Sequence, residues 1–279
     1  MADNPRTTPG ASAALSISGS DSSGGAGVQA HLKTFTAMGV YGASAITAVT
    51  AQNTTGVKAA KTLDPKLIED QITAVAGDLN IAATCTGMMA NTGVIDTVVA
   101  SIKRANLYPL VVDAVMVNKN GDSLLEENAM KALTKKLLPE AAVVTANCTE
   151  AAMLTDRDNP IDDVAGAISA AKEIMNRFKV RAVVVMGVNR PNDAEGEAVD
   201  VFYSGEAAQE LVSEWRQTKN THGAGSTFTA AITASLALGN PLEEAVQTAK
   251  SVVAETIRQA TDLGAGRGPV NHAAYIKVK

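Results

Sequence analysis

Short apolar stretches alternate with amphipathic ones along almost the whole sequence. The apolar stretches have the length and β-branched content of strands, and the amphipathic ones repeat at helical spacing. The expected strands are residues 14–18, 41–50, 81–86, 110–115, 141–145 and 180–186, and the expected helices include residues 28–38, 64–76, 91–105, 124–138 and 162–178. Such alternation builds a mostly parallel sheet with helices on both faces. We therefore predict an α/β fold with three layers, α/β/α.

The last third of the sequence departs from this alternation. Residues 197–203 and 209–215 are expected to pair as antiparallel strands around Ser204-Gly205, and a long helix should run from Asn240-Pro241 to about residue 260. We find no internal repeat and no linker, so residues 14–279 are expected to form a single domain. Residues 1–13 are polar and contain two prolines, which favours a disordered tail.

Composition excludes several classes of protein. The net charge is −5, aromatic residues make up 3% of the chain, and we see no basic stripe, so a nucleic-acid partner is not expected. No apolar run approaches the ~20 residues of a membrane span, and residues 1–13 lack the apolar core of a signal peptide. Cys85 and Cys148 lie far apart, and the three histidines lack zinc-ligand spacing. These features favour a reduced, cytoplasmic protein.

The segment Gly223-Ala224-Gly225-Ser226 precedes an apolar stretch rich in alanine. A glycine turn at the start of a helix directs unpaired N–H groups and the positive end of the helix dipole at one point. Such a point suits a phosphate or a developing oxyanion. An ordinary turn capped by Ser226 would give the same pattern.

Polar residues follow several of the expected strands. Asp113, Asn147 and Glu150 are among them, as are the Gly/Ser-rich residues 19–27, the polar residues 52–56 and Gly187. Because ligands of parallel sheets bind beyond the carboxyl ends of the strands, these residues should meet at one edge. Carboxylates beside an anion-binding turn suit phosphoryl transfer, which needs Mg²⁺ and a positioned hydroxyl.

Each of these side chains also has a purely structural interpretation. Asp113 could be a solvated carboxylate at a strand end, and Glu150 could complement the dipole of a helix start. Asn147 could bind a ligand or make a local turn. His31 projects near the apolar face of its helix, where it could line a binding site or lie at the edge of the core.

Four segments together resemble one family of enzymes. They are residues 16–29 (Ser-Ile-Ser-Gly-Ser-Asp-Ser-Ser-Gly-Gly-Ala-Gly-Val-Gln), residues 40–44 (Val-Tyr-Gly-Ala-Ser), residues 46–54 (Ile-Thr-Ala-Val-Thr-Ala-Gln-Asn-Thr) and residues 220–225 (Asn-Thr-His-Gly-Ala-Gly). The chain resembles the hydroxymethylpyrimidine/phosphomethylpyrimidine kinases of thiamine synthesis from Ala14 to about Tyr275. These kinases belong to the ribokinase-like superfamily, as do the pyridoxal kinases. The resemblance implies a homodimer that uses ATP and Mg²⁺ to phosphorylate a hydroxymethyl-bearing heterocycle.

The resemblance also implies roles for individual residues. The pyrimidine pocket would be lined by Gly19, Gln52, Met88 and Val115. Glu150 would help to hold the metal with Asp113 nearby, and Asn147 would lie near the nucleotide phosphates. Met186-Gly187 would lie near the nucleotide as well. The turn Gly223-Ala224-Gly225-Ser226 would form the anion hole that stabilises the transferring group.

Several positions differ from the family pattern. Ser226 stands where the family commonly has cysteine, and His31 stands where it usually has an aspartate that contacts the pyrimidine. Cys85 and Met186 stand where lysines are usual, and methionine cannot replace a cation beside phosphate. Three hypotheses follow: a kinase for hydroxymethylpyrimidine or its phosphate with weakened activity, a kinase of the pyridoxal type, and a non-catalytic binding protein that kept the pocket.

Overall fold

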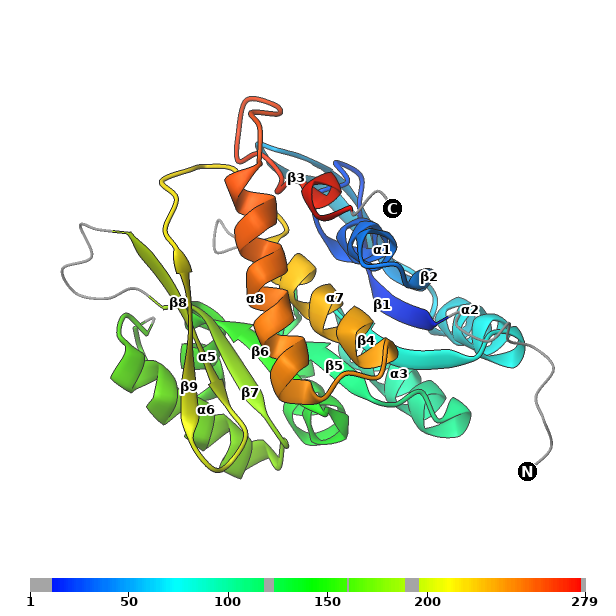
Figure 1. Ribbon diagram of the computed structural model, residues 1–279. Coiled ribbons are helices and arrows are strands. Elements are labelled where there is room, and N and C mark those ends of the chain that lie inside the picture. Colours follow the sequence, from blue (N-terminus) through cyan, green and yellow to red (C-terminus); the bar gives the residue numbers. More distant parts are fainter. Residues whose placement is uncertain (1–11, 118–122, 160, 189–195, 277–279) are drawn as a thin grey trace.

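The computed structural model describes residues 12–117, 123–159, 161–188 and 196–276. The strands of this part of the chain form one nine-stranded sheet in the order β3-β2-β1-β4-β5-β6-β7-β8-β9 (Figure 1). Their bounds are β1 Ala13–Asp21, β2 Tyr41–Asn53, β3 Gly56–Thr62, β4 Ile81–Thr86, β5 Leu110–Asp113, β6 Val143–Asn147, β7 Val183–Val188, β8 Glu197–Tyr203 and β9 Ala208–Glu214.

The centre of the sheet is parallel and its two edges are antiparallel. Strands β2, β1, β4, β5, β6 and β7 run parallel, whereas β3 pairs antiparallel with β2 at one edge. At the other edge β8 and β9 add antiparallel strands to β7. The mostly parallel sheet and the pair at residues 197–215 are both confirmed.

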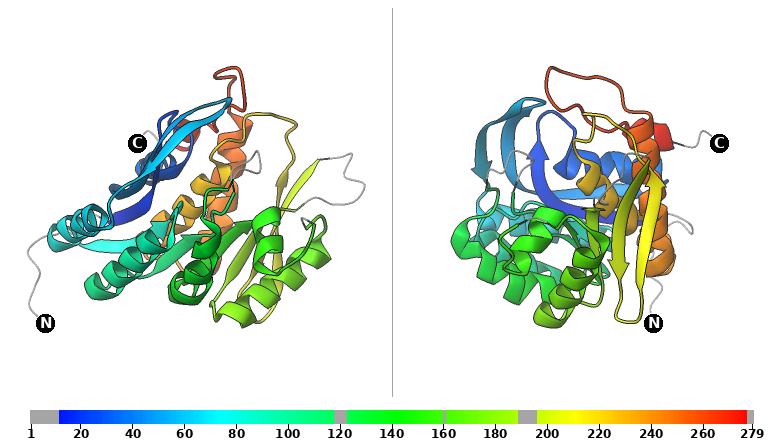
Figure 2. Two further views of the ribbon diagram at one scale, coloured as in Figure 1. Left: turned by 180° about the vertical axis from the view of Figure 1, so that it is seen from behind. Right: turned by 90° about the vertical axis from the view of Figure 1, so that its left-hand side faces the viewer.

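Helices cover both faces of the sheet. Their bounds are α1 Gly27–Ala37, α2 Pro65–Asp78, α3 Thr92–Ala105, α5 Cys148–Leu154, α6 Val164–Phe178, α7 Ala224–Ala237 and α8 Leu242–Arg258. One face carries α1, α7 and α8, which Figure 1 shows in front of the sheet. The other face carries α2, α3, α5 and α6 (Figure 2, left). The three predicted layers are confirmed.

A hydrophobic core lies on each face of the sheet. One contains Phe35 from α1, Phe228 from α7 and Val246 from α8, and the other contains side chains of α2, α3 and α6. Strands such as β5 are buried on both faces, which explains their continuous apolar sequence. Side-chain caps fix the helix starts: Asp64 accepts a hydrogen bond from Lys66 N, and Asn91 accepts one from Val94 N.

Several elements differ from their predicted form. β1 continues to Asp21 and β2 to Asn53, because these polar residues pair with each other or with β3. Strand β3 was not predicted, because its mostly exposed edge position leaves no alternation of apolar residues. Residues 124–138 contain only short helical pieces: a 3₁₀ turn Glu127–Ala129, an α turn Met130–Ala132 and a π turn Leu133–Leu137.

The turn between β2 and β3 is held by a glycine-rich segment from the far end of the chain. Thr54 accepts hydrogen bonds from Gly266 N through its hydroxyl and from Arg267 N through its carbonyl oxygen. A Cβ at Gly266 would lie 2.0 Å from Thr54 O, so this close approach needs glycine. Figure 1 shows the segment arching to the tip of the hairpin.

The structure describes only the end of the expected N-terminal tail. Of the expected tail at residues 1–13, residues 1–11 lie outside the described residues, and Ala13 already begins β1. A single domain stays our interpretation, since one sheet contains every described strand. No helix in the described part of the chain is long and apolar enough to cross a membrane.

Candidate active site

A cavity of about 470 Å³ lies at the carboxyl ends of the parallel strands. All of the predicted site residues except His31 line it. They are Gly19 from β1, Gln52 from β2, Met88 after β4, Asp113 and Val115 at the end of β5, Asn147 and Glu150 at the junction of β6 and α5, Met186 and Gly187 in β7, and Gly223, Ala224, Gly225 and Ser226 at the start of α7. The cavity therefore brings these residues together, while their individual roles stay predictions.

His31 does not line the cavity. Its side chain is on the buried face of α1, where Nδ1 lies 2.7 Å from Ser16 Oγ and 3.6 Å from Cys85 Sγ. Burial lowers the pKa of His31 to about 3, so the ring is neutral. His31 thus lies in the core, as its structural interpretation has it, and its contact with the heterocycle stays a prediction that this structure does not support. Helical spacing could not show whether His31 faces the core or the cavity, because Ser18 and Gly87 lie between the His31 ring and the cavity.

The turn at residues 223–226 has the geometry of an anion-binding helix start. Gly223 has φ of 81°, and the first helical hydrogen bond runs from Thr227 N to Gly223 O. Ala224 N donates to Thr221 O, which leaves the N–H groups of Gly225 and Ser226 without a partner inside the helix. A Cβ at Gly223 would lie 1.7 Å from Gly25 O, so only glycine fits against the first glycine loop.

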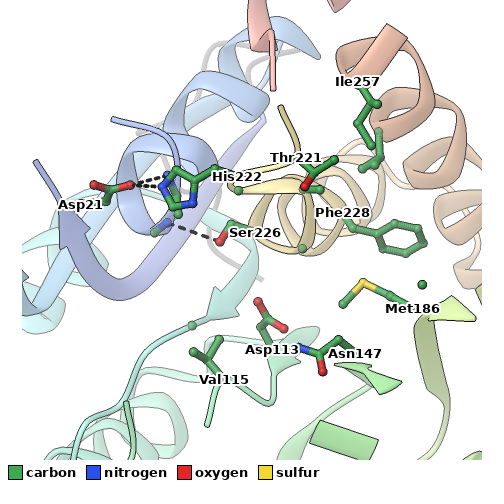
Figure 3. Close-up of a pocket in the computed structure, with 18 of the residues that line it drawn as sticks. Asp21, Asp113, Val115, Asn147, Met186, Thr221, His222, Ser226, Phe228 and Ile257 are labelled. Atoms are coloured by element: carbon green, nitrogen blue, oxygen red, sulfur yellow. Dashed lines mark hydrogen bonds and ion pairs between the residues drawn. The ribbon is translucent and has the colours of Figure 1, made fainter. Parts of the chain in front are cut away.

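Asp21 connects the first glycine loop to this turn. Its carboxylate accepts hydrogen bonds from Ser23 N, Ser23 Oγ, Gly25 N and Ala26 N, and it lies 2.7 Å from His222 Nε2 (Figure 3). Burial alone would raise its pKa, but the bonds from His222 and Ser23 outweigh burial and lower the pKa of Asp21 to about 2. No role for Asp21 was predicted from the sequence.

The side chain of His222 pairs with Asp21 and makes no hydrogen bond to Ser226. Its other neighbour at the same ring nitrogen is Gln52 Nε2, at 3.5 Å. Ser226 Oγ instead accepts a hydrogen bond of 3.3 Å from Gly27 N. His222 therefore forms no hydrogen bond that could activate the Ser226 hydroxyl in this structure.

Asp113 and Glu150 are buried carboxylates in one part of the cavity. Asp113 accepts a hydrogen bond of 3.1 Å from Thr145 Oγ1, and Glu150 accepts one of 3.4 Å from Met116 N. Burial raises the pKa of both groups, and the nearby Asp113 charge raises the pKa of Glu150 further. Figure 3 shows Asp113 lying between Ser226 and Asn147.

Asn147 and Glu150 also form a capping box at the start of α5. Asn147 Oδ1 accepts a hydrogen bond of 2.9 Å from Glu150 N, and Glu150 Oε2 accepts one of 2.9 Å from Asn147 N. The structural interpretation of both residues is therefore realised. It does not compete with a ligand role, because both side chains line the cavity as well.

A buried ion pair at the cavity was missed from the sequence. Lys250 Nζ lies 2.9 Å from Asp200 Oδ2 and donates to Ala198 O, and Asp200 Oδ1 accepts a hydrogen bond of 2.7 Å from Gly187 N. Lys250 lies four residues after Val246, on the buried face of α8. The sequence did contain a signal for this buried ion pair, because helical spacing puts Lys250 among the apolar residues of α8.

Met186 places an apolar group next to the anion-binding turn. A methyl group built on Gly225 would lie 3.7 Å from Met186 Cε. A lysine, usual at this position in the family pattern, would bring a cation there, whereas methionine brings none.

The contact between His31 and Cys85 generates a first prediction. The family pattern has aspartate and lysine at these two positions, which would make a buried ion pair in place of two neutral side chains. We expect His31→Asp to lower the free energy of unfolding by about 3 kcal/mol, because it buries an unpaired carboxylate. Cys85→Lys should be similarly costly, and the double variant should regain at least half of the summed loss in urea denaturation.

His31→Asn, which removes the ring without adding charge, is the matched control for that measurement. Losses that simply add in the double variant would contradict the inferred pairing.

Comparison with known proteins agrees with this geometry. The family model described as phosphomethylpyrimidine kinase matches residues 21–271. The chain is 44% identical over 261 residues to the hydroxymethylpyrimidine/phosphomethylpyrimidine kinase of Rhizobium meliloti, covering 93% of this chain and 96% of that protein.

Two solved structures are similar in fold. The phosphomethylpyrimidine kinase of Clostridium difficile has a TM-score of 0.73 and 39% identity, covering 88% of this chain and 98% of that one. The pyridoxal kinase of Staphylococcus aureus in complex with AMP-PCP and pyridoxal has a TM-score of 0.85 and 31% identity, covering 96% of each chain. On the sequence match and the shared ribokinase-like fold, the chain belongs to the phosphomethylpyrimidine kinase family.

Proposed function

We propose that the protein is an ATP-dependent kinase that phosphorylates hydroxymethylpyrimidine, its monophosphate or both, in thiamine biosynthesis. The observation that carries this proposal is the meeting, in one cavity, of the anion-binding turn at Gly223–Ser226 with the buried carboxylates of Asp113 and Glu150. The proposal is supported by the family to which the chain belongs and by the sequence identity of the chain to kinases of this substrate class.

The charges that line the cavity support a site for a divalent cation. The carboxylates of Asp21, Asp200 and Glu214 lie within 3.2 Å of His222, Lys250 and Arg216 respectively. Among the described residues, Asp113 and Glu150 have no such cationic neighbour. Two buried carboxylates with raised pKa values are stabilised when a cation binds beside them.

Hard carboxylate oxygens are the ligands that Mg²⁺ prefers, so Asp113 and Glu150 fit this ion directly or through its waters. When bound, Mg²⁺ would neutralise charge on the phosphates of the nucleotide. The N–H groups of Gly225 and Ser226 would donate hydrogen bonds to the transferring group, where negative charge is stabilised.

The two ends of the cavity differ in character. One end is lined by Gly19, Gln52, Met88 and Val115, and the amide of Gln52 offers both a donor and an acceptor to a ring edge. We assign the heterocyclic alcohol to this end. The other end is lined by Trp215 and by Val253, Ala254 and Ile257 of α8, and we assign the nucleobase of ATP to it.

Ser226 is compatible with turnover. In phosphoryl transfer the alcohol oxygen forms a bond to the γ-phosphorus while the bond from phosphorus to the ADP oxygen breaks, and the proton of the alcohol leaves to a phosphate oxygen or to water. The transition state is loose, so positioning and charge contribute more than a base does. The missing cation at Met186 removes one of these contributions, and we therefore propose a rate below that of relatives with lysine there.

Assembly and location stay at the level of proposal. A homodimer is what the family resemblance implies, and a cytoplasmic location is what the unpaired cysteines favour.

The second prediction concerns the substrate. With ATP and MgCl₂, we expect turnover on hydroxymethylpyrimidine or its monophosphate to exceed turnover on pyridoxal, pyridoxine and pyridoxamine in kcat/KM. A coupled assay of ADP release measures it. Higher kcat/KM on a B6 vitamer would favour the pyridoxal-kinase alternative, which is supported by the similarity in fold to the S. aureus pyridoxal kinase. Binding of a heterocycle without any turnover would favour the non-catalytic alternative.

The third prediction concerns Glu150. Glu150→Gln keeps an acceptor for Asn147 N but removes the charge, so we expect the Mg²⁺ concentration for half-maximal activity to rise at least about tenfold, which corresponds to ~1.4 kcal/mol. Asp96→Asn, a surface carboxylate paired with Lys136, is the matched control. Unchanged Mg²⁺ dependence in Glu150→Gln would remove this residue from the metal site.

The raised pKa of Glu150 gives the same variant a second readout. A carboxyl whose pKa is higher in the folded state binds more protons there, so stability without metal falls as pH rises above the usual carboxyl range. Metal-free Glu150→Gln should therefore have a higher Tm than the wild type at pH 8, and a smaller difference at pH 4.

The fourth prediction uses Trp215, the single tryptophan of the chain. If the base of ATP stacks beside it, AMP-PCP with Mg²⁺ should change the tryptophan emission, while inorganic tripolyphosphate should leave it nearly unchanged. Trp215→Ala should weaken AMP-PCP binding in calorimetry by about tenfold, since stacking on an aromatic ring contributes ~1–3 kcal/mol. An equal response to tripolyphosphate would place the base elsewhere.

A further inference from the structure

The segment that follows α8 runs along the back of the anion-binding turn. His222 N donates a hydrogen bond of 3.0 Å to Gly268 O, and Val270 N donates one of 3.2 Å to His222 O. These two bonds form a short parallel bridge between His222 and Pro269. His222, the residue just before the turn, is therefore bonded through its backbone to residues 268–270 and through its side chain to Asp21.

A second connection lies one turn further along, inside the core. Thr227 Oγ1 donates a hydrogen bond of 2.8 Å to Gly223 O and lies 3.0 Å from His272 Nε2. Thr227 belongs to the first turns of α7, and His272 begins the 3₁₀ turn η4 (His272–Tyr275). Both side chains are buried, Thr227 completely.

The direction of each hydrogen bond in this chain follows from the number of protons available. A hydroxyl has one proton, and a carbonyl oxygen can only accept, so Thr227 Oγ1 gives its proton to Gly223 O. The remaining contact then requires His272 to donate through Nε2–H. Burial, with Lys33 and His222 nearby, lowers the pKa of His272 to about 4, so the ring carries a single proton near neutral pH. The order is His272 Nε2–H to Thr227 Oγ1–H to Gly223 O.

The hydrogen bonds that start at His272 end at the carbonyl oxygen of Gly223, whose peptide group orients the anion-binding turn. Gly223 O receives both Thr227 N and Thr227 Oγ1, and Gly223 has the left-handed conformation that glycine adopts readily. The N–H groups of Gly225 and Ser226 follow two and three residues later. Donors stabilise a transition state only when they are already aimed at the charge, and a displacement of 1 Å can lower a rate 100-fold.

We propose that His272, acting through Thr227, is a positioning residue that holds the anion-binding turn in its reactive geometry. The proposal rests on the proposed kinase function for its kinetic consequences. His272 touches no substrate in this assignment, because it does not line the cavity. It contacts the turn from the core side, and residues 268–270 support the same turn through His222.

The kinetic test compares variants that keep or remove each donor. Thr227→Val, nearly the same shape without the hydroxyl, is expected to lower kcat about 10- to 100-fold with the KM for the alcohol within about threefold. Thr227→Ser keeps the hydroxyl and should stay within about threefold of wild-type kcat. His272→Gln places an amide N–H near the position of Nε2 and should retain most activity, whereas His272→Leu should fall with Thr227→Val.

Circular dichroism and Tm establish that each variant is folded before its rates are compared. If His272→Leu does not fold, the comparison of Thr227→Val with Thr227→Ser carries the test alone. A kcat for Thr227→Val within twofold of wild type, or equal losses in Thr227→Val and Thr227→Ser, would overturn the proposal.

A measurement without turnover separates this proposal from the kinase function. In ¹⁵N-histidine-labelled protein, long-range ¹H–¹⁵N spectra report the tautomer of each ring, and His272→Gln assigns the signal. The expected result is a neutral ring protonated at Nε2 from pH 6 to pH 8, with a changed Nε2 shift in Thr227→Val. A ring protonated at Nδ1, or one that titrates near pH 6.5, would overturn the hydrogen-bond chain. A wild type that is inert toward every alcohol would count against the kinase function, while this spectrum still tests the chain.

Discussion

The carboxylate of Asp21 holds together the two glycine-containing segments that form the anion-binding side of the cavity. It accepts four hydrogen bonds from its own loop, at Ser23, Gly25 and Ala26, and it pairs with His222 from the other segment. The backbone atoms of Gly25 and Gly223 can then approach so closely that neither side chain nor solvent fits between them. The cavity wall depends on this one charge, because its removal would leave the buried N–H of Gly25 and the half-buried N–H of Ala26 without an acceptor.

Much of this arrangement was predictable from the sequence. Alternating periodicity predicted the parallel sheet, and the carboxyl-end rule for such sheets predicted that Asp113, Asn147, Glu150 and the turn at Gly223 would meet. The helices predicted to start at residues 64 and 91 do begin there, with Asp64 and Asn91 as their capping residues. These signals are local in the sequence, and local signals are what periodicity and capping rules describe.

The features that escaped prediction depend on contacts between distant segments. Strand β3 has no apolar alternation, because one side of this edge strand has no neighbouring strand and most of its residues are exposed. The pairing of Lys250 with Asp200 joins α8 to β8, and neither residue type reveals its partner. His31 and the cavity lie on opposite sides of one backbone layer, which a helical-face argument cannot resolve.

The departures from the family pattern also fall into two physical groups. His31 and Cys85 contact each other in the core, away from the cavity, at two positions where the family pattern has an aspartate and a lysine. Met186 and Ser226 lie at the cavity, beside the turn that would bind the transferring group. We therefore expect the first pair to affect stability and the second pair to affect rate.

The glycine-rich segment that reaches Thr54 has a consequence for how the chain acquires its site during synthesis. The β2–β3 hairpin is translated early, but residues 264–267 that hold its tip and residues 268–272 that support the anion-binding turn are translated more than 200 positions later, as the numbering shows. The sheet can begin to pair on the ribosome while the cavity lacks one wall. The lining that α7 and α8 contribute is likewise translated after every strand of the sheet, so the side of the cavity that we assign to the nucleotide is completed last.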